Sequence, residues 1–440
     1  MKIKIRTPLW TGDIDQKSDS LQPSGFLGSL RWWTEVILRG MDKYACDPTG
    51  ESTRCPKEES DNEKYYCPAC LIFGATGMRK TFKLDISGGK GVYEGGLIRI
   101  IPSGRKRGWF LGSGLIGDID LRIIPLDRDF DESLVLLPLI LAARWGGIGA
   151  KTQHGYGVIE IKDHPEVDYD KFKKAVEKIT GEERLKRLEG PSGLNISLRN
   201  EDTNGLPNLK EMFFAKIQFE VTDDEWWKEV DGIAQMLQYK NYINDRRMIK
   251  RIMEWKKSGS VPTVPAIKSW LRYDDGRKLW GTGNQNQNRR IGNWLFGSTK
   301  RVCSYCYEEV RGDKSTPQRF WCPNCNKFLK KEETFERISS KINISCAYLV
   351  KDNLWEFRIW GWIPRSQLPG GFERDKFLNE LKKALNGSGS TTVPWTKLLG
   401  NKTRDYKLKT WREFDSSRDT EGQEGNIDNY IQSLLGGEEK

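Results

Sequence analysis

Apolar and polar residues alternate along several short segments in the first third of the chain. Such alternation predicts β-strands that bury one face. Between these segments the apolar residues recur with helical spacing, at about 29–33 and 131–144. The predicted strands are 1–6, 81–86, 120–125 and 158–161. Strands that alternate with helices in this way predict an α/β or α+β unit.

A second set of elements repeats this order later in the chain, with predicted strands at 213–221, 341–350 and 355–364 and a helix at about 372–386. Short sequence echoes accompany the repeat: Ser-Leu-Arg at 29–31 resembles Ser-Trp-Leu-Arg at 269–272, and Asp-Leu-Arg-Ile at 120–123 resembles Glu-Phe-Arg-Ile at 356–359. Phe-Gly also occurs once in each half, at 73–74 and 296–297. These echoes predict a duplicated fold.

The chain of 440 residues is too long for one compact domain, so we expect the duplicated units to be separate domains. A charged, helix-prone stretch lies between them. The expected divisions are an N-terminal domain at 1–165 with a Cys-rich insertion at about 44–70, a helical linker at 166–204, a C-terminal domain at 205–400 with a zinc-ribbon insertion at about 300–328, and a C-terminal extension at 401–440.

The chain is strongly basic, with a formal net charge of +11 and a pI near 9.0. A charge of this sign favours an anionic partner, with nucleic acid before a membrane surface. The longest apolar run, 134–143, contains Pro138 and is too short to span a bilayer. The first residues alternate like a strand and lack the apolar region of a signal peptide, so we expect a cytoplasmic protein without membrane attachment.

Eight of the nine cysteines fall into two groups of four. In a cytoplasmic chain such groups indicate metal rather than disulfides. Cys303, Cys306, Cys322 and Cys325 form two Cys-x-x-Cys pairs with zinc-ribbon spacing, which predicts a closed, structural Zn²⁺ site. Cys46, Cys55, Cys67 and Cys70 contain only one such pair, so this group is either a second zinc site, or Cys67 and Cys70 are simply buried and the other two cysteines are incidental. We therefore expect one or two Zn²⁺ ions per chain.

A glycine-rich loop between a predicted helix and a predicted strand, 146–157, is the main candidate site. Glycine backbones adopt unusual conformations and leave their N–H groups unobstructed, so such a loop can cradle phosphates. The alternative is a turn that serves only close packing of helix and strand. The candidate RNA-binding residues of the loop are Gly147, Gly149, Lys151, Thr152, Gln153, His154, Gly155 and Gly157.

Further basic residues extend this candidate set. They are Arg31, Arg79, Lys80, Arg105, Lys106 and Arg107. Trp32 and Trp33 are candidates for stacking on bases or for the core. Only two histidines, His154 and His164, are present, which argues against acid–base hydrolysis. We therefore expect no catalytic residues.

Several of these motifs resemble the RAMP superfamily of CRISPR effector proteins. They are Thr-Pro-Leu-Trp-Thr-Gly-Asp at 7–13, Gly-Ser-Leu-Arg-Trp-Trp at 28–33, the segment from Cys67 to Gly77, and the loop at 147–157. Their order and spacing are most similar to the first RAMP subunit of the type III-B CRISPR (Cmr) complex. The likeness is close over about 1–162 and looser over about 205–370.

The resemblance implies two tandem ferredoxin-like, RRM-related RAMP domains, here with four-cysteine zinc-binding insertions. It also implies a non-catalytic subunit in antiviral defence that holds guide RNA and/or target RNA near the 3′ end of the guide, beside other RAMP subunits of the complex. Two alternatives remain open from the sequence. One is a RAMP endoribonuclease that processes guide RNA, and the other is a zinc-stabilised RNA-binding protein outside CRISPR defence.

Overall fold

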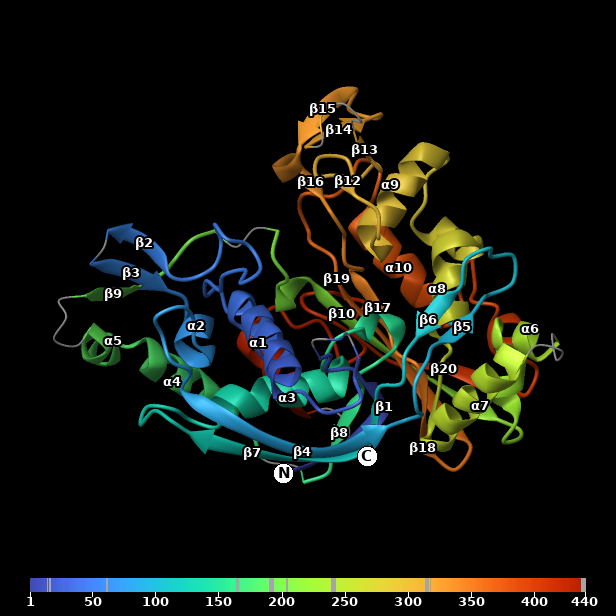
Figure 1. The fold of residues 1–440 in the computed structure, drawn as a ribbon, viewed down its shortest axis with the longest axis horizontal. Helices are drawn as coiled ribbons and strands as arrows, with labels where there is room; N and C mark the ends of the chain where they lie inside the picture. The colour runs from blue at the N-terminus through green and yellow to red at the C-terminus, as the bar shows by residue number, and fades with distance from the viewer. Residues whose placement is uncertain are drawn as a thin grey trace.

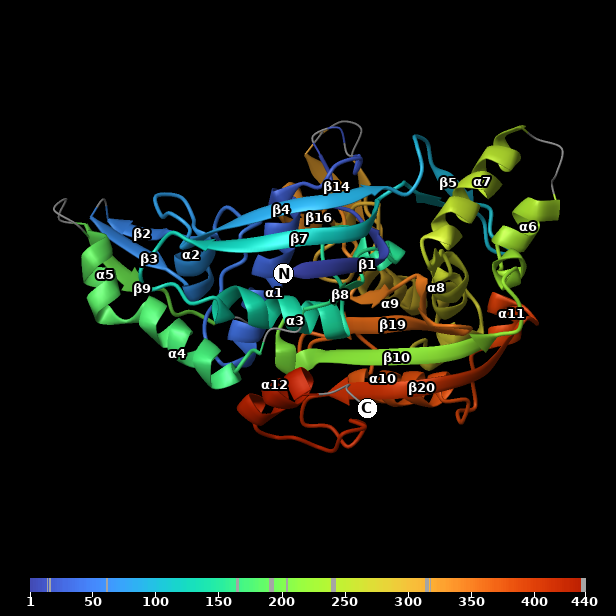
Figure 2. The same cartoon turned by 90° about the horizontal axis from the view of Figure 1, so that it is seen from below.

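The computed structural model describes residues 1–440 except 14, 16, 61, 164–165, 190–193, 203–204, 239–242, 313–315, 317 and 437–440. His164 lies outside the described residues. Two α+β domains lie side by side, and a small cysteine-containing ribbon projects from the second (Figure 1). Turned by 90°, the view shows the long strands of the two domains running next to one another (Figure 2).

The N-terminal domain has a four-stranded antiparallel sheet in the order β4-β7-β1-β8. Its elements follow the chain order β-α-β-β-α-β, which with this strand order is a ferredoxin-like fold. Along the first strand Ile3 and Ile5 are buried while Lys2 is exposed, as the alternation predicted. The elements are β1 (Lys2–Leu9), α1 (Pro23–Gly40), β4 (Phe82–Gly91), β7 (Leu115–Pro125), α3 (Ser133–Trp145) and β8 (Ile159–Ile161).

The C-terminal domain repeats this topology in the strand order β18-β19-β10-β20, with β11 beyond β18 and β17 also pairing with β19. Its elements are β10 (Met212–Val221), β11 (Ser260–Val261), α8 (Val264–Tyr273), β17 (Ile342–Ile344), β18 (Ala347–Lys351), β19 (Leu354–Trp362), α10 (Arg374–Leu385) and β20 (Thr403–Glu413). The prediction of two tandem ferredoxin-like α+β domains is confirmed.

The duplication extends to individual hydrogen bonds. In the first domain Arg31 on α1 donates to the carbonyl of Gly74 (3.0 Å), the residue that ends α2 (Pro68–Phe73). In the second domain Arg272 on α8 donates to Gly297 O (2.9 Å), which ends α9 (Gln285–Phe296). Both glycines have positive φ, 84° and 83°. The two Phe-Gly segments are therefore equivalent turns, each held by an arginine.

Several segments depart from the expected divisions. The region expected as a linker contains α4 (Tyr169–Thr180) and α5 (Glu182–Glu189), but also β9 (Asn195–Leu198), which pairs with β3 (Glu63–Tyr66) beside β2 (Lys57–Ser60). Because β20 pairs along β10, the C-terminal domain extends beyond the boundary expected at residue 400. The last helix, α12 (Ile427–Gly436), returns to pack on α3 and α4 of the N-terminal domain.

Each domain also contributes side chains to the hydrophobic core of the other. The hairpin of β5 (Ile98–Ile100) and β6 (Trp109–Leu111) belongs to the N-terminal half, yet its apolar residues join the core of the C-terminal domain. This hairpin packs on α7 (Ile243–Lys257), near the short helix α6 (Ile233–Gln238). The shared packing fixes the position of the glycine-rich loop, which lies between the two domains.

Candidate nucleic-acid groove and metal sites

The first cysteine group closes into a compact buried cluster between α1, α2 and the β2–β3 hairpin. The Sγ atoms of Cys46, Cys55, Cys67 and Cys70 all lie within 4.8 Å of one another. Cys46 Sγ and Cys70 Sγ are 3.5 Å apart. A tetrahedral zinc ion with Zn–S bonds of about 2.3 Å places its sulfur ligands about 3.8 Å apart. The spacing therefore fits four thiolates around one metal ion.

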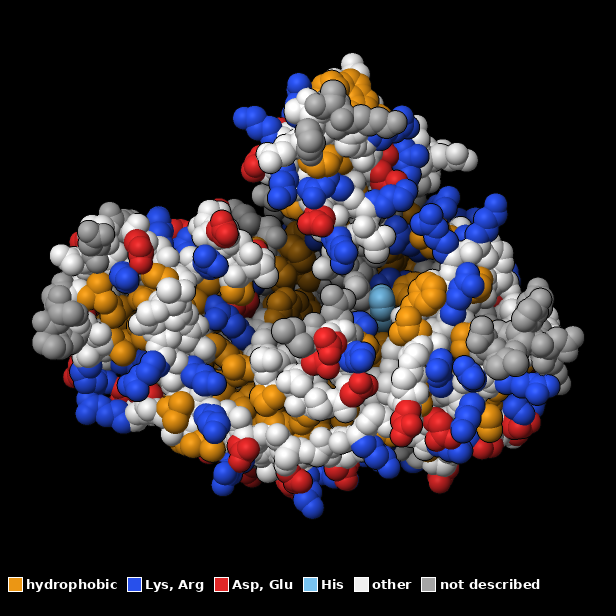
Figure 3. All heavy atoms as spheres, in the orientation of Figure 1, with side chains coloured by type: hydrophobic (Ala, Val, Ile, Leu, Met, Phe, Trp, Pro, Cys, Tyr) orange, Lys and Arg blue, Asp and Glu red, His pale blue; other side chains and the backbone are white. Residues whose placement is uncertain are grey.

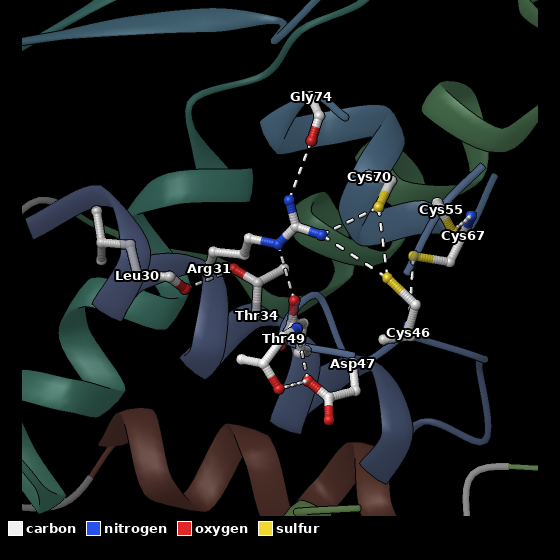
Figure 4. A network of polar contacts seen from close by, with 12 residues as sticks. Leu30, Arg31, Thr34, Cys46, Asp47, Thr49, Cys55, Cys67, Cys70 and Gly74 are labelled. Carbon is white, nitrogen blue, oxygen red and sulfur yellow. Dashed lines mark hydrogen bonds and ion pairs between the residues drawn. The ribbon is translucent and has the colours of Figure 1, made fainter. Parts of the chain in front are cut away.

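Arg31 points directly at this cluster (Figure 4). Its Nη2 donates to Cys70 Sγ (3.0 Å) and lies 3.8 Å from Cys46 Sγ, while its Nε bonds Glu35 (2.8 Å). On the other side, Arg199 Nη1 lies 4.0 Å from Cys55 Sγ. Four thiolates around a divalent ion carry a net charge of −2, so these guanidinium groups stabilise the charged form. Arg31, a candidate RNA contact from sequence, is thus engaged at the cysteine cluster.

The second cluster lies in the projecting ribbon. Cys303, Cys306, Cys322 and Cys325 also lie within 4.8 Å of one another, with Cys303–Cys325, Cys306–Cys322 and Cys306–Cys325 Sγ separations of 3.8, 3.6 and 3.5 Å. Both clusters can therefore hold a metal ion, and four thiolates at this spacing are consistent with zinc. Each set is complete without water or substrate, so the geometry suits a structural role.

A groove of about 560 Å³ separates the two domains. It opens on the face in Figure 3, where the surface is hollowed between the N-terminal domain and the ribbon-bearing domain. The N-terminal part of α1, the glycine-rich loop, and strands β17 and β19 form its walls. No acidic side chain occurs among its described lining residues. The polar and aromatic side chains most suited to contact a ligand there are Trp32, Lys151, Asn343, Lys341 and Trp362.

The glycine-rich loop is tied to the second domain. Thr152 Oγ1 donates to Asn343 Oδ1 (3.0 Å), and Gln153 Oε1 accepts from the Ser340 N–H (3.2 Å). The Gly155 carbonyl accepts from the Cys346 N–H (3.0 Å). The predicted donors Thr152 and Gln153 therefore hold the loop against β17, and they line the groove at the same time.

The loop glycines divide into two groups. Gly155 and Gly157 are buried with φ of 97° and 86°, and an added Cβ would lie 2.4 Å from Cys346 Sγ and 2.0 Å from Ile148 O, respectively. These two positions need glycine for close packing, the alternative that the sequence left open. Gly147 and Gly149 line the groove, as do Lys151, Thr152 and Gln153, but Gly149 also has a positive φ (86°), and an added Cβ there would lie 2.6 Å from Trp10 O.

Lys151 carries the positive charge of the loop. Its residue adopts the left-handed conformation (φ 59°), and its Nζ lies 3.1 Å from the centre of the Trp10 ring. Burial lowers the pKa of Lys151 to about 8. Across the groove, Lys341 Nζ lies 4.3 Å from the Trp362 ring centre, and burial lowers its pKa to about 8. Both ammonium groups are therefore partly dehydrated cations held by aromatic faces.

His154 is held as a neutral imidazole. Burial, then the charges of Lys268 and Lys151, lower its pKa to about 4. Its Nδ1 is buried without a hydrogen-bond partner among the described residues, and its ring meets Trp109 edge-on at 5.2 Å. Beneath the loop, Lys268 donates to Gln153 O and Ser340 Oγ, and burial lowers its pKa to about 7.

The other predicted basic residues do not line the groove in the described structure. Arg79 and Lys80 are exposed beside the Gly74 turn. Arg105 pairs with Asp274 and lies over the Tyr273 ring, whereas Lys106 and Arg107 are exposed on the β5–β6 loop. Of the two adjacent tryptophans, Trp33 is buried and donates to Gly147 O, and Trp32 lines the groove.

The sequence did not predict the groove residues that the second domain contributes. Lys341, Asn343, Trp360 and Trp362 come from strands of the second domain. They fall in predicted strands, and nothing in their local pattern separates them from ordinary strand residues. The repeated order of elements in the two halves was the one available signal for these residues, because it predicted a second domain that could face the loop.

Comparison with known proteins supports the N-terminal assignment. Residues 2–160, which include the loop, match the family model of the RAMP superfamily, the family that the motifs resemble. No curated protein matches the sequence.

Among solved structures, the chain is similar to apo Cmr1 from Pyrococcus furiosus, with a TM-score of 0.34 and 13% identity over 86% of this chain and 94% of that chain. It is also similar to a chain in the type III-B Cmr-beta complex bound to cognate target RNA and AMPPnP in the presence of ssDNA, with a TM-score of 0.33 and 12% identity over 86% and 96% of the two chains. TM-scores this low do not establish a common fold over the whole chain. None of the described helices combines the length and hydropathy needed to cross a bilayer.

Proposed function

We propose that this chain is a non-catalytic RNA-binding subunit of a type III-B CRISPR (Cmr) ribonucleoprotein effector. In this proposal it holds guide RNA and/or target RNA near the 3′ end of the guide, beside other RAMP subunits, in antiviral defence. The observation that carries the RNA-binding part is the groove between the domains, whose walls come from a RAMP domain and its partner domain. The motif order in the RAMP domain carries the assignment to the Cmr complex.

The composition of the groove suits a single RNA strand. Lys151 and Lys341 can neutralise phosphates, while Trp32 and Trp362 offer ring faces for bases. Hydrogen bonds from the loop and from Asn343 suit phosphate and sugar oxygens, which position a strand without reading its sequence.

The surroundings of His154 support a role in holding RNA rather than cutting it. A general base for RNA cleavage works best with a pKa near the ambient pH, whereas the pKa of His154 is about 4. Burial is the main cause of this low pKa, and the charges of Lys268 and Lys151 also oppose the imidazolium that a base would become. Cleavage of repeat RNA by the purified chain, abolished by His154→Ala, would instead establish the endoribonuclease alternative.

A larger side chain in the groove should weaken RNA binding without unfolding the chain. Gly28 lies on α1 at the groove, and an added Cβ there meets nothing within 4 Å. Gly28→Leu should project into the groove and lower RNA affinity by at least about tenfold, the loss of roughly one stacked base. Gly28→Ala is the matched control, since it should stabilise the helix by about 0.5–1 kcal/mol and leave RNA binding intact.

Both variants should be expressed with an affinity tag in native cells, followed by sequencing of the bound RNA and identification of copurified proteins. We expect guide RNA and RAMP subunits with the wild-type chain and with Gly28→Ala, and less RNA with Gly28→Leu. Absence of guide RNA and of RAMP subunits from the wild-type sample would contradict the assignment to a Cmr complex and favour an RNA-binding protein outside CRISPR defence.

RNA affinity and stability should respond to pH in opposite directions. Lys151 and Lys341 have pKa values of about 8, so both lose charge between pH 7 and 9, and affinity for single-stranded RNA should fall by about tenfold. An unfolded lysine has a pKa near 10.4, so from about pH 8 to 10 the unfolded chain binds more protons and these two residues make the free energy of unfolding rise with pH. Anisotropy titrations at constant ionic strength, compared with Lys151→Arg, measure the first effect. An affinity equal at pH 7 and pH 9 would show that the two lysines do not contact RNA.

A further inference from the structure

The cysteine ribbon is inserted in the second domain at a place where the first domain has only a short turn. In the first domain, Ala75 and Met78 are bridged across a short turn after Gly74. In the second domain, Ser298 and Ile338 are bridged in the equivalent place after Gly297, and the strands of the ribbon lie between them in the chain. The ribbon stands out from the body (Figure 1). Its strands are β12 (Val302–Cys303), β13 (Arg311–Gly312), β14 (Arg319–Cys322), β15 (Lys327–Lys330) and β16 (Thr334–Phe335).

The register of the β13-β14-β15 sheet sorts its side chains onto two faces. Phe320 lies opposite Leu329, and Cys322, two residues further on, shares their face. Cys322 and Leu329 are buried with the cysteine cluster, so this is the inner face. Because successive residues of a strand point to opposite sides, the outer face carries Arg311, Arg319, Trp321, Phe328 and Lys330.

The outer face combines aromatic rings with unpaired cations. Phe328 is 45% exposed, its ring centre is 5.0 Å from that of Trp321, and Arg319 lies 4.6 Å above it. Arg311, Arg319 and Lys330 form no ion pair with a carboxylate in the described part of the chain. Figure 3 shows hydrophobic and basic side chains together on the projecting ribbon.

The contact of Arg319 with the Phe328 ring stabilises part of this arrangement, whereas the charge opposite Arg319 opposes it. Arg319 lies directly opposite Lys330, and like charges in that position destabilise a sheet. The metal site already stabilises the ribbon from the inner face. An anionic ligand on the outer face would turn this repulsion into attraction, and the two rings between the cations suit flat groups spaced along a charged backbone.

We propose that the outer face of the ribbon binds single-stranded RNA, with bases stacked on Trp321 and Phe328 and phosphates contacted by Arg311, Arg319 and Lys330. Single-stranded nucleic acid is commonly bound in this way, by rings for the bases and cations for the backbone. The site is distinct from the groove between the domains and does not depend on it. The competing occupant, an acidic protein segment, is separated from RNA by the experiment below.

The test uses the full chain and a short fluorescein-labelled oligouridylate. The charge variant is Arg311→Gln, Arg319→Gln and Lys330→Gln, in which every altered residue is exposed. The control variant, Lys351→Gln, Lys407→Gln and Lys409→Gln, removes the same charge from exposed positions of β18 and β20. Loss of three phosphate contacts should lower the slope of log affinity against log salt by about 2, since each contact contributes about 0.7 for a single strand. The control should leave that slope unchanged, and equal metal content will show that the ribbon is folded.

Photo-crosslinking with 4-thiouridine RNA supplies the second measurement. We expect crosslinks on Trp321 or Phe328 in the wild-type chain and in Lys151→Ala, because the ribbon binds without the groove. An unchanged salt slope together with no crosslink on 319–330 would overturn the proposal. If the charge variant lost a copurifying protein while its RNA crosslinks stayed the same, the face would be assigned to a protein partner. If only the groove variants bound RNA normally, the groove proposal would be contradicted and the ribbon proposal would not.

Discussion

Arg358→Met should lower the free energy of unfolding by about 3–5 kcal/mol, whereas Arg122→Met should change it by less than about 1 kcal/mol. The two arginines occupy echoed positions on the corresponding strands β19 and β7. Arg358 is buried, donates to the carbonyls of Ala143 and Gly146, and bonds the Tyr348 hydroxyl (2.8 Å). Its Nε also lies 3.8 Å from Glu356. Removing it leaves buried oxygens unbonded at the junction of the domains.

Arg122 is the matched control because its pair with Asp85 is largely exposed, at 73% and 52% of the two side chains. Water can replace Arg122 as the partner of Asp85 at a small cost in free energy. Equilibrium denaturation of the two variants and the wild-type chain, followed by fluorescence, measures the difference. Equal losses of stability in the two variants would show that Arg358 does not join the domains.

The two cysteine clusters should differ in how their loss affects the body of the protein. Cys67→Ala and Cys322→Ala should each remove one metal ion from a chain that offers two four-cysteine sites. The first cluster is continuous with the N-terminal hydrophobic core, so its loss should lower the unfolding midpoint by more than about 10 °C. The ribbon cluster packs only with Leu329 and a few partly buried neighbours, so its loss should shift the midpoint by less than about 2 °C.

Metal analysis by mass spectrometry and calorimetry of the same samples check this difference. A chelator that removes both ions should reproduce the Cys67→Ala midpoint, because the ribbon contributes little to the body. Wild-type chain without bound metal would refute both sites. Equal shifts in the two variants would mean that the ribbon is part of the body's cooperative unit.

Local pattern was enough to predict several strands and helices of both domains and the ribbon's metal ligands, but not β20, which falls in the region expected as a C-terminal extension. The period of two in residues 1–6 and 213–221 predicted two strands, and β1 and β10 confirm them, although the first six residues of β10 are all buried. The Cys-x-x-Cys spacing likewise determines which thiolates can meet. The first cysteine cluster was less certain from sequence, because Cys46 and Cys55 reach Cys67 and Cys70 only when α1 and α2 pack together.

The sequence by itself determined the duplicated order of strands and helices, the glycine-rich loop and the two cysteine groups, because each depends on residues close together in the chain. Only the tertiary structure decided what these pieces do. It turned Arg31 toward the cysteines, buried Arg358 but exposed Arg122, and placed Lys341 and Trp362 across from Lys151. Those outcomes depend on which surfaces meet when two similar domains pack against each other. Similar local sequences cannot encode that difference, because burial and hydrogen-bond partners depend on the tertiary structure.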